Sequence, residues 1–119
     1  MNLIGYILNQ REWSRETFGP GDRLAGITAH IEKELAEVRA SGGKDIYEWC
    51  DVIILALDGA WRAGHTPEQI AQALLDKHAK NRARVWPDWR TAGPGPIEHV
   101  RDMQELPPPK RRVRRKQEA

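Results

Sequence analysis

The chain has 119 residues, of which 39% are hydrophobic and 30% charged, values that suit one small globular domain and argue against a disordered chain. Its N-terminal apolar run, residues 3–8, is too short for a membrane span or a signal peptide. The single cysteine, Cys50, excludes an intrachain disulfide and fits a reducing cytoplasm.

The net charge of +2 is unevenly distributed along the chain. Residues 110–116, KRRVRRK, hold six of the nineteen basic residues, whereas residues 1–109 hold 13 basic and 16 acidic residues. Positive charge confined to a tail does not by itself indicate a nucleic-acid partner. We expect a folded domain over 1–96, a Pro-rich linker over 97–109 and a basic, disordered tail over 110–119. A weak, salt-dependent contact of the tail with phosphates is the alternative.

Apolar residues spaced by three and four predict four helices, over about 2–17, 23–40, 46–63 and 67–84. Asp22 and Asp45 are the expected N-caps of the second and third helices, and TPEQ at 66–69 is a capping box for the fourth. Neither strand alternation nor a phosphate-binding glycine loop is present. We therefore predict an all-α bundle of four to five helices.

The third helix predicts an oligomer. IYEWCDVIILALDGAW, residues 46–61, is apolar nearly all round, which a helix exposed on one side of a small bundle does not need. A single core is also thin in a chain of this length. We expect a dimer or a tetramer to complete the core of the bundle.

Two acid pairs with the same spacing lie on consecutive helices. Glu34 and Glu37 share one helix face, and Glu48 and Asp51 share a face of the next helix. The short turn between these helices can bring all four carboxylates together, where they would repel each other unless a cation neutralises them. Mg²⁺ suits such oxygen ligands. The alternative is a solvated charged surface without a metal.

The fourth helix carries a complementary stripe. Lys77, Lys80, Asn81 and Arg84 recur at the spacing of one helix face and suit a polyphosphate. A plain basic surface is the alternative.

Several other side chains are candidates for smaller parts. Asn9 and Gln10 could contact the edge of a base, and Trp13 and Trp49 could stack on one, although a place in the core suits both tryptophans equally. The remaining expectations are that Asp58 pairs with Arg62, that His30 lies on a helix surface, and that Trp86 and Trp89 anchor the loop after the fourth helix.

These motifs together resemble a known family. Glu34-x-x-Glu37 followed by Glu48-x-x-Asp51 is similar to the signature of the all-α MazG-like nucleoside triphosphate pyrophosphohydrolases. The segments W-S-x-x-T-F-G-P-G-D-R, from residue 13, and K-x-x-K-N-x-x-R-x-W-P-D-W, from residue 77, resemble its short, often phage-encoded dATP/dGTP branch, called MazZ. The similarity covers residues 8–90. Lys33 departs from the pattern, since many relatives carry an acid there.

The resemblance implies metal-assisted hydrolysis of dGTP and dATP between the α and β phosphates. The four acids would hold two or three Mg²⁺ or Mn²⁺ ions, and the stripe on the fourth helix would bind phosphates. In phages that replace adenine with 2-aminoadenine, the reaction would remove dATP and supply dGMP in the host cytoplasm. The alternatives left open are a dCTP or dUTP pyrophosphohydrolase, a helical nucleic-acid-binding module and a structural oligomer.

Overall fold

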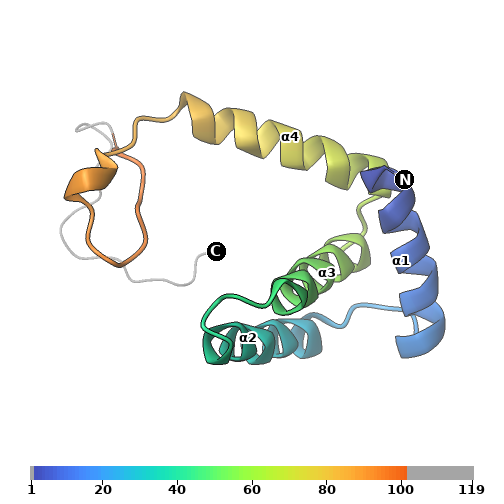
Figure 1. The fold of residues 1–119 in the computed structure, drawn as a ribbon. Coiled ribbons are helices and arrows are strands. Elements are labelled where there is room, and N and C mark those ends of the chain that lie inside the picture. Colours follow the sequence, from blue (N-terminus) through green and yellow to red (C-terminus); the bar gives the residue numbers. More distant parts are fainter. Residues whose placement is uncertain (1, 102–119) are drawn as a thin grey trace. The chain divides into compact units, whose positions relative to one another are not determined.

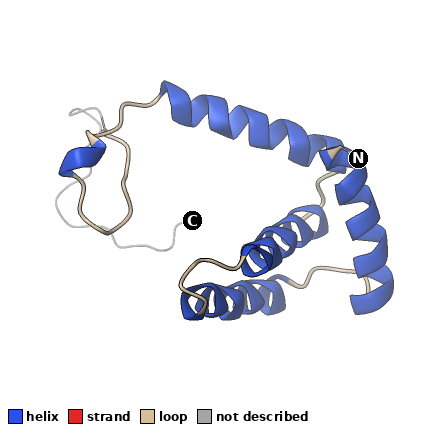
Figure 2. Ribbon diagram, viewed as in Figure 1, coloured by secondary structure: helices blue, strands red, loops and turns tan. Residues whose placement is uncertain are grey.

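The computed structural model describes residues 2–101 and divides the chain into two compact parts, with the boundary between Asp76 and Lys77. The elements in chain order are α1 (Leu3–Phe18), α2 (Leu24–Ala40), α3 (Ile46–Arg62), α4 (Pro67–Ala83) and the short 3₁₀ helix η1 (Trp89–Thr91) (Figure 1). The all-α prediction is confirmed, since residues 2–101 form no strand beyond one isolated bridge (Figure 2). None of the helices in this range is long and apolar enough to span a membrane.

The helix starts follow the local chemistry of the sequence. The Asp45 carboxylate accepts a hydrogen bond from the backbone N–H of Tyr47, as expected of an N-cap. Thr66 and Gln69 exchange two reciprocal bonds in the predicted capping box. The prediction for Asp22 was wrong by one residue. Arg23 occupies the N-cap position, and Asp22 lies before it, with its carboxylate accepting from the N–H of Leu24.

In the first part of the chain, α2 and α3 lie side by side and α1 contacts α3. A turn over residues 41–45 joins α2 to α3, and Gly42 and Gly43 both adopt positive φ there, which favours glycine. The core gathers one or two apolar side chains from each of three helices, Ile7, Leu57, Trp61 and Ile70. The face of α2 that packs on α3 adds Ile27 and Val38.

The apolar faces are less buried in the single chain than their spacing predicts. On α1, Leu3 and Leu8 are exposed beside the fully buried Ile7, and on α4 Ile70 is buried while Leu74 and Leu75 are exposed. Within one chain the apolar run of α3 is only partly covered, since Ile53 is 57% exposed and Val52, Ile54 and Leu55 are half-buried. Its expected burial in an oligomer stays a prediction. Among residues 2–101, the packing therefore leaves much of the apolar surface of α3 uncovered.

The second part begins within α4 and continues through residues 84–101. The N–H of Val100 donates to the carbonyl of Val85 at 2.6 Å, so the first residues of the predicted linker fold back on this segment. Trp86 anchors the segment as predicted, donating to the carbonyl of Asn81 at 2.7 Å. Trp89 does not, because it is 70% exposed. Residues 102–109 of the predicted linker and the predicted tail lie outside the described residues.

Candidate active site

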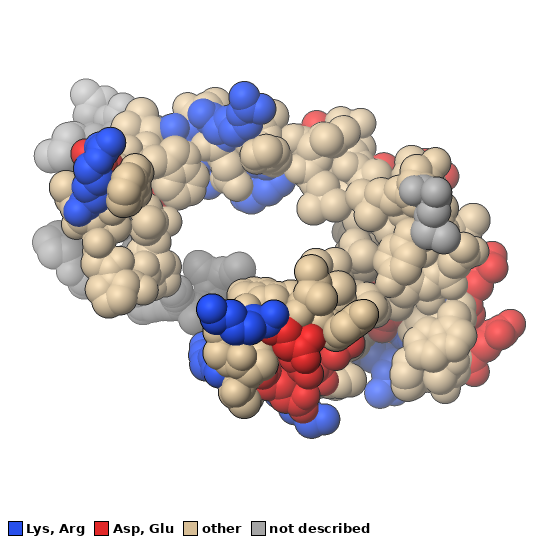
Figure 3. All heavy atoms as spheres, viewed as in Figure 1, with Lys and Arg blue, Asp and Glu red and all other residues tan. Residues whose placement is uncertain are grey.

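Three of the four predicted acids meet between α2 and α3. Glu34 projects from α2, and Glu48 and Asp51 project from the first turns of α3. One carboxylate oxygen of each lies within 4.8 Å of the other two. The antiparallel packing of two helices joined by a short turn produces this meeting, because it sets the third turn of α2 beside the start of α3. Figure 3 shows Asp and Glu atoms gathered over these two helices.

Glu37, the fourth predicted acid, is exposed and contributes no oxygen to this group. Its charge nevertheless reaches the site. Partial burial raises the pKa of the Glu48 carboxyl above its ordinary value, and the negative charges of Glu37, Asp45, Asp51 and Glu34 raise this pKa further. The prediction that four carboxylates share one neighbourhood thus holds for three in direct reach and one at longer range.

Two oxygens in this cluster have no hydrogen-bond partner. Oε1 of Glu34 and Oε1 of Glu48 are buried, and neither is bonded to any group among residues 2–101. An unpaired buried carboxylate oxygen is unfavourable, and like charges beside it add to the free-energy cost. A hard divalent cation would satisfy both oxygens and the charge at once. The donor set, oxygen only and partly open to solvent, fits Mg²⁺ or Mn²⁺.

His30 lies on the helix surface, as expected, and it also contacts the acid cluster. Its Nε2 lies 3.2 Å from Oε2 of Glu34, one helical turn further along α2. The His30 side chain is half exposed, as expected of a residue on a helix surface. The contact follows from the i, i+4 spacing, which was the signal in the sequence. The contact involves Oε2 of Glu34, while Oε1 is the oxygen without a hydrogen-bond partner among the described residues.

A cavity of about 160 Å³ lies beside this cluster through His30, which lines the cavity and contacts Glu34. Its lining comes from three helices of the first part, with Phe18 from α1, His30 from α2 and Leu55 and Asp58 from α3. Arg23, at the start of α2, adds a cationic group. The cavity therefore combines an apolar wall, an aromatic ring and polar groups next to the acid cluster.

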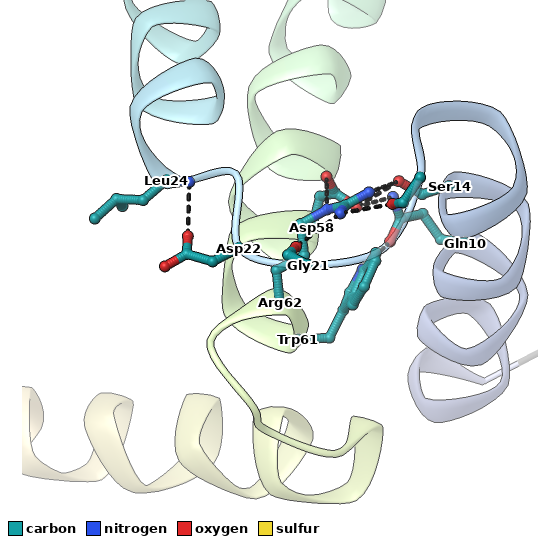
Figure 4. A network of polar contacts seen from close by, with 9 residues as sticks. Gln10, Ser14, Gly21, Asp22, Leu24, Asp58, Trp61 and Arg62 are labelled. Atoms are coloured by element: carbon teal, nitrogen blue, oxygen red, sulfur yellow. Dashed lines mark hydrogen bonds and ion pairs between the residues drawn. The ribbon is translucent and has the colours of Figure 1, made fainter.

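The polar end of this cavity rests on a buried network (Figure 4). Asp58 and Arg62 form the predicted pair, with Nε to Oδ2 at 3.0 Å. The other Asp58 oxygen accepts from the Ser14 hydroxyl at 2.7 Å and from the Gln10 amide at 3.2 Å. Gln10 in turn accepts from the indole N–H of Trp61 at 2.8 Å.

The network changes the assignment of one base-contact candidate. Both ends of the Gln10 amide are bonded inside the protein and the side chain is buried, so Gln10 has a structural part. Ser14 was missed in the sequence, although Ile7, Gln10 and Ser14 share one helix stripe and all three are buried. The signal in the sequence was the spacing, which places the polar side chains of Gln10 and Ser14 on the same helix face as Ile7. Asn9 is exposed, and Trp13 is 57% exposed with its ring edge-on to Phe18.

The predicted phosphate-binding residues lie in the second part of the chain, at the end of α4 and just after it. Lys77 and Lys80 are exposed, while Asn81 and Arg84 are half-buried. Nη1 of Arg84 donates to Oδ1 of Asn81 at 3.1 Å, which leaves the amide N–H groups of Asn81 for another acceptor. Figure 3 shows Lys and Arg atoms gathered over this part of α4.

An all-helical chain with E-x-x-E on one helix, E-x-x-D on the next and a cluster fit for a divalent cation is a protein of the MazG-like class. The sequence matches the family described as dATP/dGTP pyrophosphohydrolase over residues 6–106, and the chain belongs to this family.

One similar protein is a dATP/dGTP diphosphohydrolase from Salmonella phage PMBT28, 39% identical over 74 residues. The matched region is 62% of this chain and 24% of that relative, so the chain corresponds to about a quarter of the relative's length. No solved structure matches the chain significantly.

Proposed function

We propose that the chain hydrolyses dGTP and dATP to the monophosphate and pyrophosphate, and that it needs Mg²⁺ or Mn²⁺. The family and the phage relative support the substrates. The observation that carries the metal requirement is the pair of buried, unpartnered oxygens on Glu34 and Glu48, within a cluster of three carboxylates. In the reaction, a water oxygen bonds to the α-phosphorus while the bond from that phosphorus to the bridging oxygen breaks. Pyrophosphate leaves with the bridging oxygen.

Each acid has a defined part in this proposal. Glu34, Glu48 and Asp51 hold the first metal ion directly. Glu37, which lies outside their cluster, adds negative charge and is the fourth ligand of a site for two or three ions. When bound, the metal supplies a water of lowered pKa and neutralises charge on the phosphate oxygens. His30 orients Glu34 through its 3.2 Å contact, as groups outside the ligand set often do.

The cations at the end of α4 and just after it provide the phosphate contacts, for a nucleotide bound either at the acids of the same chain or at those of a neighbouring subunit. Lys77 and Lys80 are exposed, and Arg84 and Asn81 hold each other in place. A fixed guanidinium beside two mobile ammonium groups suits a triphosphate, which presents several oxygens at different depths. Asn9 and Trp13, both exposed on α1, remain the candidates for contact with the base.

A homo-oligomer, a dimer or a tetramer, is part of the proposal. The exposed apolar residues of α3, among them Ile46, Tyr47 and Ile53, support it, because one chain leaves them in water. The phage relative supports a setting in the cytoplasm of an infected cell. There the reaction would remove dATP and provide dGMP for 2-aminoadenine DNA.

Product analysis tests the proposal. The chain is incubated with dGTP, dATP, dCTP, dTTP or dUTP, with Mg²⁺ or with EDTA, and the products are separated by ion exchange. We expect monophosphate and pyrophosphate from the two purine nucleotides, and no reaction with EDTA. Products from dCTP or dUTP alone would favour the pyrimidine alternative, and release of orthophosphate would mean a different bond is cleaved. Absence of any product would contradict the enzymatic proposal.

A further inference from the structure

A single arginine ties the loop before α2 to the end of α3 (Figure 4). Nη1 of Arg62 donates to the carbonyl of Gly19 at 2.9 Å and to that of Gly21 at 3.0 Å. Its Nε bonds Asp58 at 3.0 Å and its Nη2 bonds the Ser14 hydroxyl at 3.0 Å. One planar guanidinium thus joins α1, the G-P-G loop of residues 19–21 and α3.

The hydrogen bonds from Arg62 hold the loop of residues 19–21 in position. Gly19 and Gly21 have φ of 88° and 97°, which favour glycine, and Pro20 between them has no backbone N–H to donate. The loop N–H of Gly19 bonds back to α1, but the two carbonyls are bonded to α3 through Arg62. The Arg62 side chain itself is held rigidly, since it is 2% exposed and its guanidinium carbon lies 4.5 Å from the centre of the Trp61 ring.

The residues on either side of this loop line the cavity beside the acid cluster. Phe18 precedes Gly19, and Arg23 follows Asp22, and both line that cavity. Asp58, the partner of Arg62, lines it as well, and so does His30, which contacts Glu34. The position of the loop therefore decides where an aromatic ring and a cation stand relative to the metal-binding carboxylates.

We infer that Arg62 is a positioning residue for nucleotide binding, acting by holding the loop of residues 19–23 so that Phe18 and Arg23 face the cavity next to the acid cluster. This inference rests on the function proposed above. Arg62 is outside the acid cluster and does not line this cavity, so it acts through the loop. Its effect is on the affinity for the nucleotide, because the acids on α2 and α3 do not depend on the loop.

Two variants of the full chain separate positioning from stability. Arg62→Lys keeps the positive charge beside Asp58, but an ammonium cannot span Asp58 and two carbonyls as a guanidinium fork does. Ser14→Ala removes a hydroxyl that bonds both Asp58 and Arg62 but does not touch the loop. Each variant is checked for helix content and melting temperature before the kinetics.

The readouts are the kinetic constants for dGTP with Mg²⁺ and the hydrogen exchange of the backbone amides of residues 19–24. For Arg62→Lys we expect KM to rise about tenfold with kcat within about twofold of the native value. We also expect exchange in this segment to rise about tenfold, because the loop opens more often. For Ser14→Ala we expect a lower melting temperature with KM and loop exchange unchanged.

Three results would overturn the inference. Unchanged exchange in Arg62→Lys would mean that the loop is held by other groups. Faster exchange with an unchanged KM would mean that the loop does not position the nucleotide. An equal rise of KM in Ser14→Ala would mean that the effect follows stability. A native protein that releases no pyrophosphate would contradict the proposed function instead, and the exchange experiment would still decide whether Arg62 holds the loop.

Discussion

Glu48 is affected both by burial and by the charges of neighbouring acids. Its Oε1 is buried without a partner among the described residues, and four other acids raise its pKa. Without a cation, this arrangement opposes folding, since the charged carboxylate is disfavoured in the native state. Residue types that oppose folding persist where function requires them, and acids with a perturbed pKa cluster at such sites.

The variant Glu48→Gln separates the effect of this carboxylate on stability from its effect on metal binding. It keeps the shape of the side chain but removes the charge, so we expect a higher melting temperature in EDTA. We also expect a much smaller stabilisation by Mn²⁺ than in the native chain, because a ligand has been lost. Hydrolysis of dGTP should fall by about two orders of magnitude or more. Thermal melts with and without Mn²⁺ and pyrophosphate release measure the three quantities.

Glu32→Gln is the matched control, since Glu32 is exposed on α2 and is absent from the cluster. It should leave the Mn²⁺ stabilisation and the activity unchanged. A Glu48→Gln protein that melts below the native chain in EDTA, or that is stabilised equally by Mn²⁺, would remove Glu48 from the metal site.

The raised pKa of Glu48 also predicts a pH dependence of stability. The ordinary pKa of the carboxyl is 4.5, and below it the group is protonated in both folded and unfolded chains. As the pH rises from 4.5 through the raised folded value, the unfolded chain loses its proton more readily, so this group lowers the free energy of unfolding. In EDTA, the free energy of unfolding of Glu48→Gln should therefore exceed that of the native chain by an amount that grows over this pH range. Urea unfolding at a series of pH values measures it, and a difference independent of pH would contradict the assignment.

Lys80 tests the phosphate stripe of α4. Lys80→Ala should raise KM for dGTP about tenfold or more, since hydrogen bonds to charged groups contribute about 1.5–3 kcal/mol. Arg82→Ala is the control, because Arg82 is an exposed cation of the same helix that lies off the stripe. Steady-state kinetics compare the two variants. Equal effects on KM would indicate a general effect of positive charge and no specific contact.

At the scale of the elements, the helices of the first part are joined by polar as well as apolar contacts. Asp58 on α3 bonds Gln10 and Ser14 on α1, and this network lies beside the apolar core around Ile7 and Trp61. Buried polar groups of this kind are favourable only while every member is satisfied. The packing of α1 on α3 therefore depends on the Asp58–Arg62 pair.

Asp58→Asn should lower the free energy of unfolding by about 3 kcal/mol, because it leaves the Arg62 charge buried without a carboxylate. Side-chain exposures of 2% for Arg62 and 9% for Asp58 justify treating the pair as buried. Chemical denaturation in EDTA measures the change. Asp76→Asn, at an exposed site on α4, should change stability by less than about 0.5 kcal/mol. A similar small effect for Asp58→Asn would show that the carbonyls of the loop suffice to satisfy Arg62.

At the scale of the whole molecule, the core of one chain is small and much apolar surface stays in water. Large apolar side chains are exposed on each of the four α-helices, with Leu3, Leu24, Ile53 and Leu75 as examples. Exposed apolar area of this extent is typical of chains that associate. The surface supports the oligomer proposed above.

Ile53→Glu tests the oligomer. Ile53 is 57% exposed in one chain, so a charge there should not harm the fold of the monomer, but it should disrupt an interface on α3. Sedimentation or light scattering should show a native dimer or tetramer and a smaller species for the variant, with helix content retained. Thr17→Glu adds the same charge at an exposed site on α1 and should leave the assembly unchanged. A native chain that is monomeric at micromolar concentration would contradict the proposal.

Local features were the most predictable part of the protein. The four helices begin and end within a residue or two of the predicted positions, because caps such as Asp45 and the Thr66–Gln69 box act over a few residues. The acid pairs were also predictable, since i, i+3 spacing places two side chains on one face in any helix. Burial was predicted less well, because periodicity shows which face is apolar and says nothing about what covers it.

The sequence by itself determined the helices, the all-α class and the two acid pairs, since each depends on local spacing and capping. Only the tertiary structure decided that Glu34, Glu48 and Asp51 meet within 4.8 Å while Glu37 does not. It also decided that Gln10 is bonded inside the protein and that Arg62 holds the loop before α2. These outcomes depend on how the helices are rotated and packed against each other, which is set by contacts between residues 40–50 positions apart in the chain.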